Sequence, residues 1–275
     1  MEANAGKICA PDKPLPVRSG FFQGFLDPRK LLLKTATLVV VLGVWQMASM
    51  HYHSDLMLPS PLKTGRALFL ALQDISMLKN LLLTIRRLLT GLGTALAIGL
   101  TLGIIMGYSR TILGLIDPII GSVRQVPIMA WVPLTIVWFG LGDGPTIFLI
   151  AMVGTFPILL NTIAGVQSVP QSYYNAARSM GASPWTLFFS VTLPASLPDI
   201  MTGVRIAVGA GWMSVICAEF IATSAGFGYS MVEAQTMLET PLLMALMIIA
   251  AGVGYGTDRL LLLAKRSMMK WQFVE

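Results

Sequence analysis

Apolar residues along this chain are gathered into long runs that alternate with short polar segments. A run of about 20 residues is long enough to cross the hydrocarbon core of a bilayer as a helix. One run, 126–141, is short and is interrupted by Pro127 and Pro133, and it gains length if the weaker apolar segment 112–123 lies along or just below it. The pattern predicts an all-α, polytopic membrane protein with about six transmembrane helices, at residues 31–50, 85–107, 126–141, 145–166, 200–222 and 241–263.

The composition agrees with this pattern. Apolar residues make up 55% of the 275 residues, charged residues make up 12%, and the mean hydropathy is +0.73. Soluble globular chains carry roughly 25% charged residues, so this chain lacks the charge needed to cover a surface that faces water. A disordered chain is excluded, a soluble enzyme is disfavoured, and the apolar surface is expected to face lipid.

The positive charge is placed in a way that indicates membrane orientation. The net charge of +6 lies in short basic clusters at the ends of apolar runs, which is not the pattern expected for nucleic-acid binding. With six spans and both termini in the cytosol, the inner side holds 14 Lys and Arg residues and the outer side five. This split follows the positive-inside rule. The sequence therefore predicts a cytosolic tail over residues 1–30, an uncleaved first span and a cytosolic C-terminus.

The loops between the spans are too short for a second folded domain. Loops 51–84 and 167–199 hold about 33 residues each, whereas a folded nucleotide-binding domain needs at least about 50. The chain also has no G-x-x-x-x-G-K-[ST] phosphate-binding loop. If this protein uses ATP, another chain is expected to bind it.

Small residues recur at every fourth position inside two of the predicted spans. The first series is Gly91, Ala95, Gly99, Gly103 and Gly107, and the second is Gly203, Ala207 and Gly211. Such a stripe lies on one face of a helix and allows a neighbouring helix to approach closely. Two interpretations stay open: plain helix packing, or smooth faces along which helices slide or tilt between two states.

Ionisable groups are rare within the predicted spans. The main candidate is Glu219, in the outer third of the fifth span, and Arg86 and Arg87 lie near the outer end of the second. Glu219 is expected either to form an ion pair with one of these arginines or to line a vestibule near the outer mouth. Trp131 and Trp138 suit interfacial anchoring or a lined cavity.

No metal site or disulfide is predicted. His51 and His53 lie just outside the first span, and no cysteine or further histidine is near them, so they are read as interfacial residues. Cys9 stands in a polar tail and Cys217 in an apolar run, which gives no disulfide framework.

The segment 168–194 carries the most specific local signals. Ser168 is expected to cap a short helix whose first turn holds Pro170, where a missing N–H costs nothing. Gly181 is expected to end this helix, because glycine readily adopts the left-handed conformation that follows a helix C-terminus.

A second short helix is expected directly after this glycine. Ser183 and Pro184 again place a cap before a proline, and Leu193-Pro194 is expected to end the helix. Two short helices joined at a glycine form a compact elbow. Ala176-Ala177 gives this elbow a small face that can enter a groove on a partner protein.

The same residues stand at the spacing of a known signature. Permease subunits of bacterial ATP-binding-cassette (ABC) importers carry E-A-A, three residues, G, nine residues and then I-x-L-P. Here Asn175-Ala176-Ala177, Gly181 and Val191-x-Leu193-Pro194 occupy these positions. Asn175 replaces the glutamate and so loses a charge that could pair with an ATPase, while Val191 replaces the isoleucine. The chain resembles this family.

Other segments resemble one branch of the family, which imports sulfonates, taurine, nitrate and bicarbonate. These segments are the outer loop at Leu58–Pro61, the proline-rich stretch Arg124–Gly140, and Thr202–Glu219 in the fifth span. The last of these, together with the ending Met269–Trp271, is most similar to taurine and alkanesulfonate permeases. The resemblance covers roughly Leu58 to Lys265.

The resemblance implies the type I ABC importer permease fold over residues 31–275, with a cytosolic coupling-helix loop at 168–197. It implies that two permease chains form one pore in the bacterial inner membrane, above a cytosolic ATPase dimer that binds ATP and Mg²⁺. It also implies an extracytoplasmic binding protein that delivers a small anion. The chain itself would then catalyse no reaction and hold no cofactor or metal. The residues that the resemblance assigns to ATPase coupling are Asn175, Ala176, Ala177, Gly181, Ala182, Leu193 and Pro194. The candidates for the translocation pathway are Trp131, Trp138, Trp212 and Glu219.

Two rival classes are weighed against this resemblance. A secondary carrier or channel predicts inverted repeats with broken helices and ionisable groups at the bilayer midplane. Neither feature is clear in the sequence, although Pro127 and Pro133 are compatible with a broken helix in the third span. An intramembrane hydrolase needs a nucleophile beside a base, yet both histidines lie outside the spans.

Overall fold

The computed structural model describes residues 28–269, with side chains from Leu31 onward, and these residues form helices and no strand. The chain divides into a unit that ends at His53 and a unit that begins at Ser54. The first unit contributes α1 (Pro28–Tyr52). The second contains α2 (Pro61–Gln73), α3 (Ile75–Tyr108), α4 (Arg110–Arg124), α5 (Ile128–Phe139), α6 (Asp143–Gln167), α7 (Gln171–Ser179), α8 (Pro184–Leu187), the π-helical turn η2 (Phe188–Thr192), α9 (Leu193–Ala222), α10 (Phe227–Thr236) and α11 (Thr240–Met268).

The predicted spans are confirmed within the described residues, with two changes. Five helices are long and apolar enough to cross a membrane, and the bent pair α4–α5 brings the number to as many as six. α1 is apolar over Leu31–Tyr52, and its side chains are exposed within the unit, as expected for a helix that faces lipid. The first change is at α3, which begins at Ile75 rather than near residue 85.

The helices α3 and α6 form the centre of the second unit, and their contact explains the small-residue stripe. A side-chain carbon placed on Gly99 would lie 2.9 Å from Cβ of Ile158, and one on Gly103 would lie 2.6 Å from Cβ of Thr162. These distances leave no room for a side chain. The same contact repeats along both helices at intervals of four residues, through the pairs Gly91–Ile150, Ala95–Gly154, Gly99–Ile158, Gly103–Thr162 and Gly107–Val166.

This five-step register decides between the two interpretations of the stripe. A branched side chain of α6 occupies the space above a glycine of α3 at four of the five steps, so the helices interlock at van der Waals distance. To slide along α6 by one turn, α3 would have to break all five of these contact pairs. The structure therefore favours plain packing, in which α3 and α6 form one tightly joined pair.

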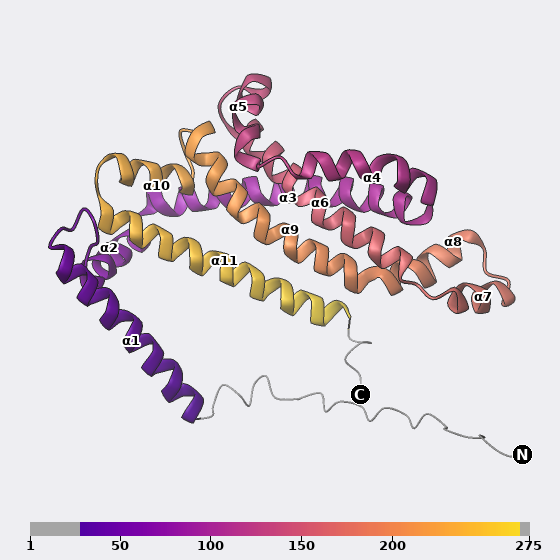
Figure 1. The fold of residues 1–275 in the computed structure, drawn as a ribbon, viewed down its shortest axis with the longest axis horizontal. Coiled ribbons are helices and arrows are strands. Elements are labelled where there is room, and N and C mark those ends of the chain that lie inside the picture. The colour runs from indigo at the N-terminus through magenta and orange to yellow at the C-terminus, as the bar shows by residue number, and fades with distance from the viewer. Residues whose placement is uncertain (1–27, 270–275) are drawn as a thin grey trace, which may run out of the picture. The chain divides into compact units, whose positions relative to one another are not determined.

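The contact pairs also fix the direction in which the helices run. Residue numbers rise together along α3 and α6, so these two helices are parallel. They fall along α9 as they rise along α6, because Gly203 meets Pro157 and Gly211 meets Ile150. α11 packs against α9 and runs opposite to it, and the helices lie side by side in Figure 1.

Two parallel helices need a return connection between them, and α4 and α5 supply it. α4 begins where α3 ends, and the loop after α5 reaches the opposite end of the unit, where the Gly142 N–H donates to the Ala222 carbonyl at 2.8 Å. The two helices are bent by 95° at the break before Pro127, whose ring disfavours a helical conformation at the residue before it. This is the second change: the third span is a broken pair, and α5 alone, with 12 residues, is too short to cross.

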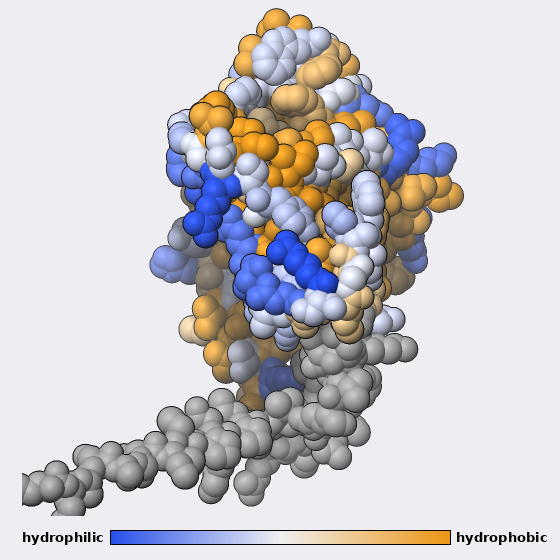
Figure 2. Space-filling model, turned by 90° about the vertical axis from the view of Figure 1, so that its right-hand side faces the viewer, coloured by the Kyte–Doolittle hydropathy of each residue, from blue (hydrophilic) through white to orange (hydrophobic). Residues whose placement is uncertain are grey.

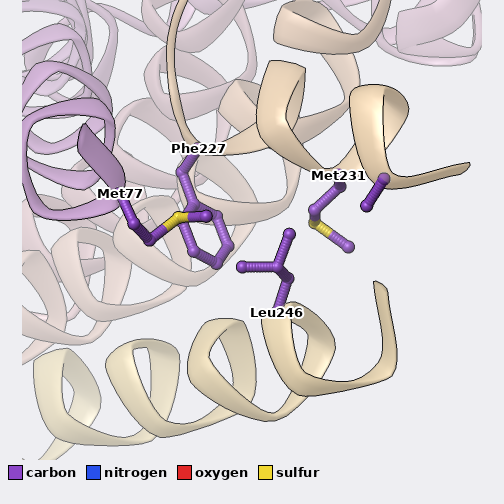
Figure 3. Close-up of a cluster of buried hydrophobic side chains, with 5 residues drawn as sticks. Met77, Phe227, Met231 and Leu246 are labelled. Atoms are coloured by element: carbon purple, nitrogen blue, oxygen red, sulfur yellow. The ribbon is translucent and has the colours of Figure 1, made fainter. Parts of the chain in front are cut away.

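A small hydrophobic cluster joins α3, α10 and α11. Phe227 and Leu246 are fully buried, and Met77 and Met231 close over them (Figure 3). Below we call this end of the unit the α10 end, and the opposite end, where α3 finishes at Tyr108, the α7 end. The sequence pattern did not predict α2 and α10, because both are short helices that do not span a bilayer.

Candidate functional site

The predicted elbow is present at the α7 end, but its first helix begins differently from the prediction. Pro170 is the N-cap of α7, and no side chain caps this helix. Ser168 instead ends α6: its N–H donates to the Ala164 carbonyl and its hydroxyl to the Gly165 carbonyl, both at 2.9 Å. The prediction that Ser168 caps the first elbow helix is therefore wrong, because α6 extends through Gln167 and uses this serine at its own C-terminus.

Gly181 ends α7, as predicted. Its φ angle is +82°, a left-handed conformation that a residue with a side chain adopts only at a cost. The Gly181 N–H donates to the Arg178 carbonyl at 2.9 Å, and the Ala182 N–H donates to the Ala177 carbonyl at 3.1 Å. These two bonds are the Schellman pattern, so the corner of the elbow has a defined geometry.

The second elbow helix starts as predicted and ends differently. Ser183 caps it by accepting the Thr186 N–H at 3.2 Å, with Pro184 in the first turn. It does not stop at Leu193-Pro194. The helix passes through the π-helical turn η2 into α9, which gives 39 continuous residues from Pro184 to Ala222.

The wrong prediction at Pro194 has a local cause. Proline normally ends a helix because it has no N–H for the carbonyl one turn earlier. Here the preceding turn is widened, and the Leu193 N–H reaches back five residues to the Phe188 carbonyl. Pro194 then lies in the first turn of α9, where a missing N–H is tolerated.

The residues expected to couple to an ATPase do not all lie on the open face of the elbow. Asn175 and Ala176 are exposed, and Gly181 is at the exposed corner. Ala177 is only 9% exposed and faces inward. The remaining three, Ala182, Leu193 and Pro194, are half-buried.

Sequence reasoning missed a group of exposed apolar side chains on the elbow. Met180 is 83% exposed and Trp185 is 74% exposed. Trp185 stacks on Phe189, with ring centroids 6.1 Å apart and an interplanar angle of 17°. Large apolar side chains at a polar helical corner are a signal for a protein contact, and the sequence shows these residues in a segment outside the predicted spans.

Two hollows flank the elbow. One of about 830 Å³ lies among the ends of α3, α4, α6 and α7, and Arg110, Asp117 and Arg178 are among its lining residues. The other, of about 520 Å³, lies between α7 and α8 and is lined mainly by apolar groups, with Tyr108 and Tyr174 at one side. Figure 2 views the structure from the α7 end and shows hydrophilic and hydrophobic residues side by side on this surface.

The α10 end contains a buried ionic cluster around Arg87. Its Nη1 lies 2.7 Å from Oε1 of Glu219 and donates to the Ala225 carbonyl at 2.7 Å. Its Nε lies 2.7 Å from Oδ1 of Asp143, whose other oxygen lies 2.6 Å from Arg86. The side chain of Glu219 is fully buried and that of Arg87 is 4% exposed. The ion pair considered from the sequence is therefore formed with Arg87, and Asp143 is a partner that the sequence did not reveal.

Neutral donors complete the shell around Glu219. The Thr84 hydroxyl donates to the carboxylate at 2.8 Å and accepts the Phe227 N–H at 2.8 Å, and the Gly228 N–H also donates to the carboxylate at 2.8 Å. Gly226 has a φ angle of +124°, and a side-chain carbon there would lie 2.5 Å from Cδ of Glu219. The cluster thus fixes the turn between α9 and α10 against α3.

The four residues assigned to a translocation pathway lie in different surroundings. Glu219 faces the cluster just described rather than open space. Trp212 is 7% exposed, and its indole N–H donates to the Ala250 carbonyl of α11 at 3.2 Å. Trp138 is 52% exposed and packs edge-on against Phe148. Trp131 is half-buried.

The described residues contain no group of histidine, cysteine and acidic side chains that could hold a metal ion. Nδ1 of His53 lies 2.9 Å from the carbonyl oxygen of His51. These residues lie in or next to α1, in the unit that ends at His53.

Comparison with known proteins identifies the family. Residues 99–257 match the profile of the binding-protein-dependent transport system inner membrane component. The taurine transport permease TauC of Escherichia coli is 34% identical over 249 residues, which cover 88% of this chain and 90% of TauC. The nitrate import permease NrtB of Synechocystis is 29% identical, over 86% of this chain and 88% of NrtB.

A solved structure shares the fold. An inward-facing structure of the MetNI methionine ABC transporter aligns with a TM-score of 0.56 at 18% identity, over 67% of this chain and 94% of the other. The family match covers more than half of the sequence, and TauC matches most of its length. The chain belongs to the binding-protein-dependent transport system inner membrane component family and is a multi-pass permease subunit of an ABC importer, in which a separate ATPase hydrolyses ATP.

Proposed function

We propose that this chain forms, with a second copy of itself, the translocation pathway of an importer for a small anion. An extracytoplasmic binding protein delivers the anion, and two cytosolic ATPases bind ATP and Mg²⁺. The elbow of α7 and α8 docks into a groove of each ATPase and transmits its movement to the membrane helices. Membership of the family supports binding-protein and ATPase partners in general.

The elbow carries the docking proposal. Its corner has a defined backbone geometry through the Schellman bonds at Gly181. Asn175 and Ala176 form a small exposed face, and the apolar side chains of Met180 and Trp185 project from the same elbow. A rigid helical corner with exposed apolar side chains suits insertion into a groove on a partner protein.

The distribution of basic residues supports a cytosolic α7 end. The start of α4, the elbow and the end of α11 all lie toward this end, and they carry Arg110, Arg178, Lys265 and Arg266. Cytosolic ends of spans are enriched in Lys and Arg. We therefore orient the protein with the α7 end and both termini in the cytosol and with the α10 end outside.

Taurine or another aliphatic sulfonate is the favoured cargo, with nitrate or bicarbonate as the alternative within the same branch. The similarity to TauC and the matching fifth span support a sulfonate. Two arginines of the spans are neutralised within the chain: Arg87 by Glu219 and Asp143, and Arg205 by Asp258 through bonds of 2.6 and 2.9 Å. Neither offers an uncompensated cation to an anion, so we assign selection mainly to the binding protein.

The docking proposal is tested by replacing Ala176 with arginine. This side chain is exposed, so the substitution should leave insertion and folding intact while placing a long charged side chain in the contact. We expect the ATPase to be lost from the purified complex and uptake of labelled taurine to fall to background. The matched control is Gln235→Arg, on an exposed position of α10.

The result also decides between the proposed function and its rival. If the Ala176→Arg complex retains the ATPase and full uptake, the docking assignment is wrong. A secondary carrier would instead show uptake that survives removal of every ATPase and follows an ion gradient.

A further inference from the structure

Three hydroxyl groups from separate elements meet behind the elbow. The Tyr108 hydroxyl, at the end of α3, donates to Oγ1 of Thr192 at 2.5 Å. The Tyr174 hydroxyl, in the middle of α7, lies 3.0 Å from the same oxygen. Thr192 is fully buried and ends the π-helical turn η2. One threonine oxygen therefore connects α7 to both α3 and the base of α9.

The π-helical turn places this oxygen where both tyrosines can reach it. A hydroxyl has one proton to donate and can accept two hydrogen bonds. The Tyr108 hydroxyl donates to Thr192, and the hydroxyls of Thr192 and Tyr174 share a second hydrogen bond in which either can be the donor. Oγ1 of Thr192 also lies 3.4 Å from the Leu187 carbonyl, five residues earlier. This buried hydroxyl therefore has three hydrogen-bond partners. Such insertions of a wide turn into a helix often mark functional positions.

The remaining attachment of α7 to the rest of the unit is slight. Its principal packing partners are α8 and η2, the two elements that follow it in sequence. Ala177 is the buried side chain of this helix, and it offers little contact area. The hydroxyl cluster is therefore a specific polar link between α7 and the membrane helices.

On the other side of this link, the structure is tightly joined. Tyr108 is the last residue of α3, one position beyond Gly107, where the interlocking register with α6 ends. Thr192 directly precedes α9, and α9 packs along α6 through Gly203 and Gly211. A displacement of Tyr108 or Thr192 therefore moves α3, α6 and α9 together rather than one side chain.

We propose that Tyr108, Tyr174 and Thr192 are positioning residues that transmit the movement of α7 to the paired helices α3 and α6 and to α9. This inference rests on the proposed docking of the ATPase on α7. It assigns docking to the exposed face around Ala176 and transmission to the hydroxyl cluster centred on the buried Thr192. The two roles can be separated, because the hydrogen bonds meet at the buried Thr192 oxygen and not at the exposed face around Ala176.

The test uses the complete importer, reconstituted in lipid vesicles with its ATPase and binding protein. Tyr108→Phe, Tyr174→Phe and Thr192→Val each remove a hydroxyl and keep the shape of the side chain. We expect each complex to assemble and hydrolyse ATP. In each tyrosine variant the amount of taurine taken up per ATP should fall roughly fivefold, the factor that corresponds to about one net hydrogen bond. In Thr192→Val, which removes the oxygen that both tyrosines contact, it should fall at least as far.

Two variants serve as matched controls. Tyr173→Phe removes the hydroxyl of the adjacent tyrosine on α7, which is 57% exposed and lies outside the cluster. Thr192→Ser keeps the hydroxyl at the buried position. Both should retain the transport-to-ATP ratio of the unchanged protein. A purely structural role would lower the yield of the complex instead of this ratio.

Two results would overturn the inference. The first is an unchanged ratio in both tyrosine variants, which keep the backbone and leave Thr192 in place. The second is loss of the ATPase from these complexes, which would show that the hydroxyls serve docking. Failure of the proposed function is read separately, from retention of the ATPase by Ala176→Arg.

Discussion

The buried ionic cluster makes a quantitative prediction about two neighbouring arginines. In Arg87→Gln, the carboxylate of Glu219 keeps its neutral donors but loses its cation while remaining fully buried. Removing one partner of a buried ion pair costs about 3–5 kcal/mol, because the other charge is left uncompensated away from water. We expect a loss of stability of this size.

Arg86 supplies an unusually close control. It is adjacent in sequence, it is also an arginine, and it also binds Asp143, but its side chain is 67% exposed. An exposed ion pair contributes about 0–1 kcal/mol, so Arg86→Gln should be nearly silent. Both variants can be unfolded from mixed micelles by raising the fraction of denaturing detergent, with the free energy of unfolding obtained from circular dichroism.

The reasoning would be refuted by equal losses in the two variants. A second experiment removes both charges: Arg87→Gln combined with Glu219→Gln should recover part of the loss, since a buried amide needs no cation. Exchanging the two charges should not restore stability. The Gly228 N–H donates to the side chain at position 219, and the Ala225 carbonyl accepts from the side chain at position 87. These backbone groups favour an acidic side chain at 219 and a basic one at 87, and the exchange would reverse both.

Two further predictions concern glycines. Gly103→Ala would place a carbon 2.6 Å from Cβ of Thr162 and should lower the free energy of unfolding by about 1–3 kcal/mol. Gly93→Ala on the same helix meets open space and should leave the free energy of unfolding unchanged. Gly181→Ala should loosen the elbow, because its φ of +82° costs a side chain roughly 1–2 kcal/mol; hydrogen exchange of residues 171–187 should quicken, whereas Gly114→Ala on α4, where the space is open, should leave it unchanged. A slower or unchanged exchange in Gly181→Ala would contradict the assignment of this corner.

The sequence predicted features that depend on local patterns. Apolar runs located α1, α6 and α11 to within about five residues and the end of α9 at Ala222, because hydrocarbon thickness sets the length of a span. The start of α9 was predicted near residue 200, whereas this helix begins at Leu193. The glycine at 181 and the cap at Ser183 were correct, since both follow from the backbone preferences of single residues.

Features that depend on contacts between distant segments were missed. Asp143 joins Arg87 across 56 positions, and Tyr108 meets Thr192 across 84; no local pattern brings these residues together. The prediction at Pro194 failed for a related reason. The rule that proline ends a helix assumes a regular preceding turn, and here that turn is π-helical.

The register between α3 and α6 restricts which changes in length this fold can accept. Removing or adding one residue between 91 and 107, or between 150 and 166, would rotate the following part of that helix by about 100° and set branched side chains against branched side chains. Proteins that share this architecture should therefore keep both intervals constant in length and differ in length elsewhere, for example in the turn that precedes α2.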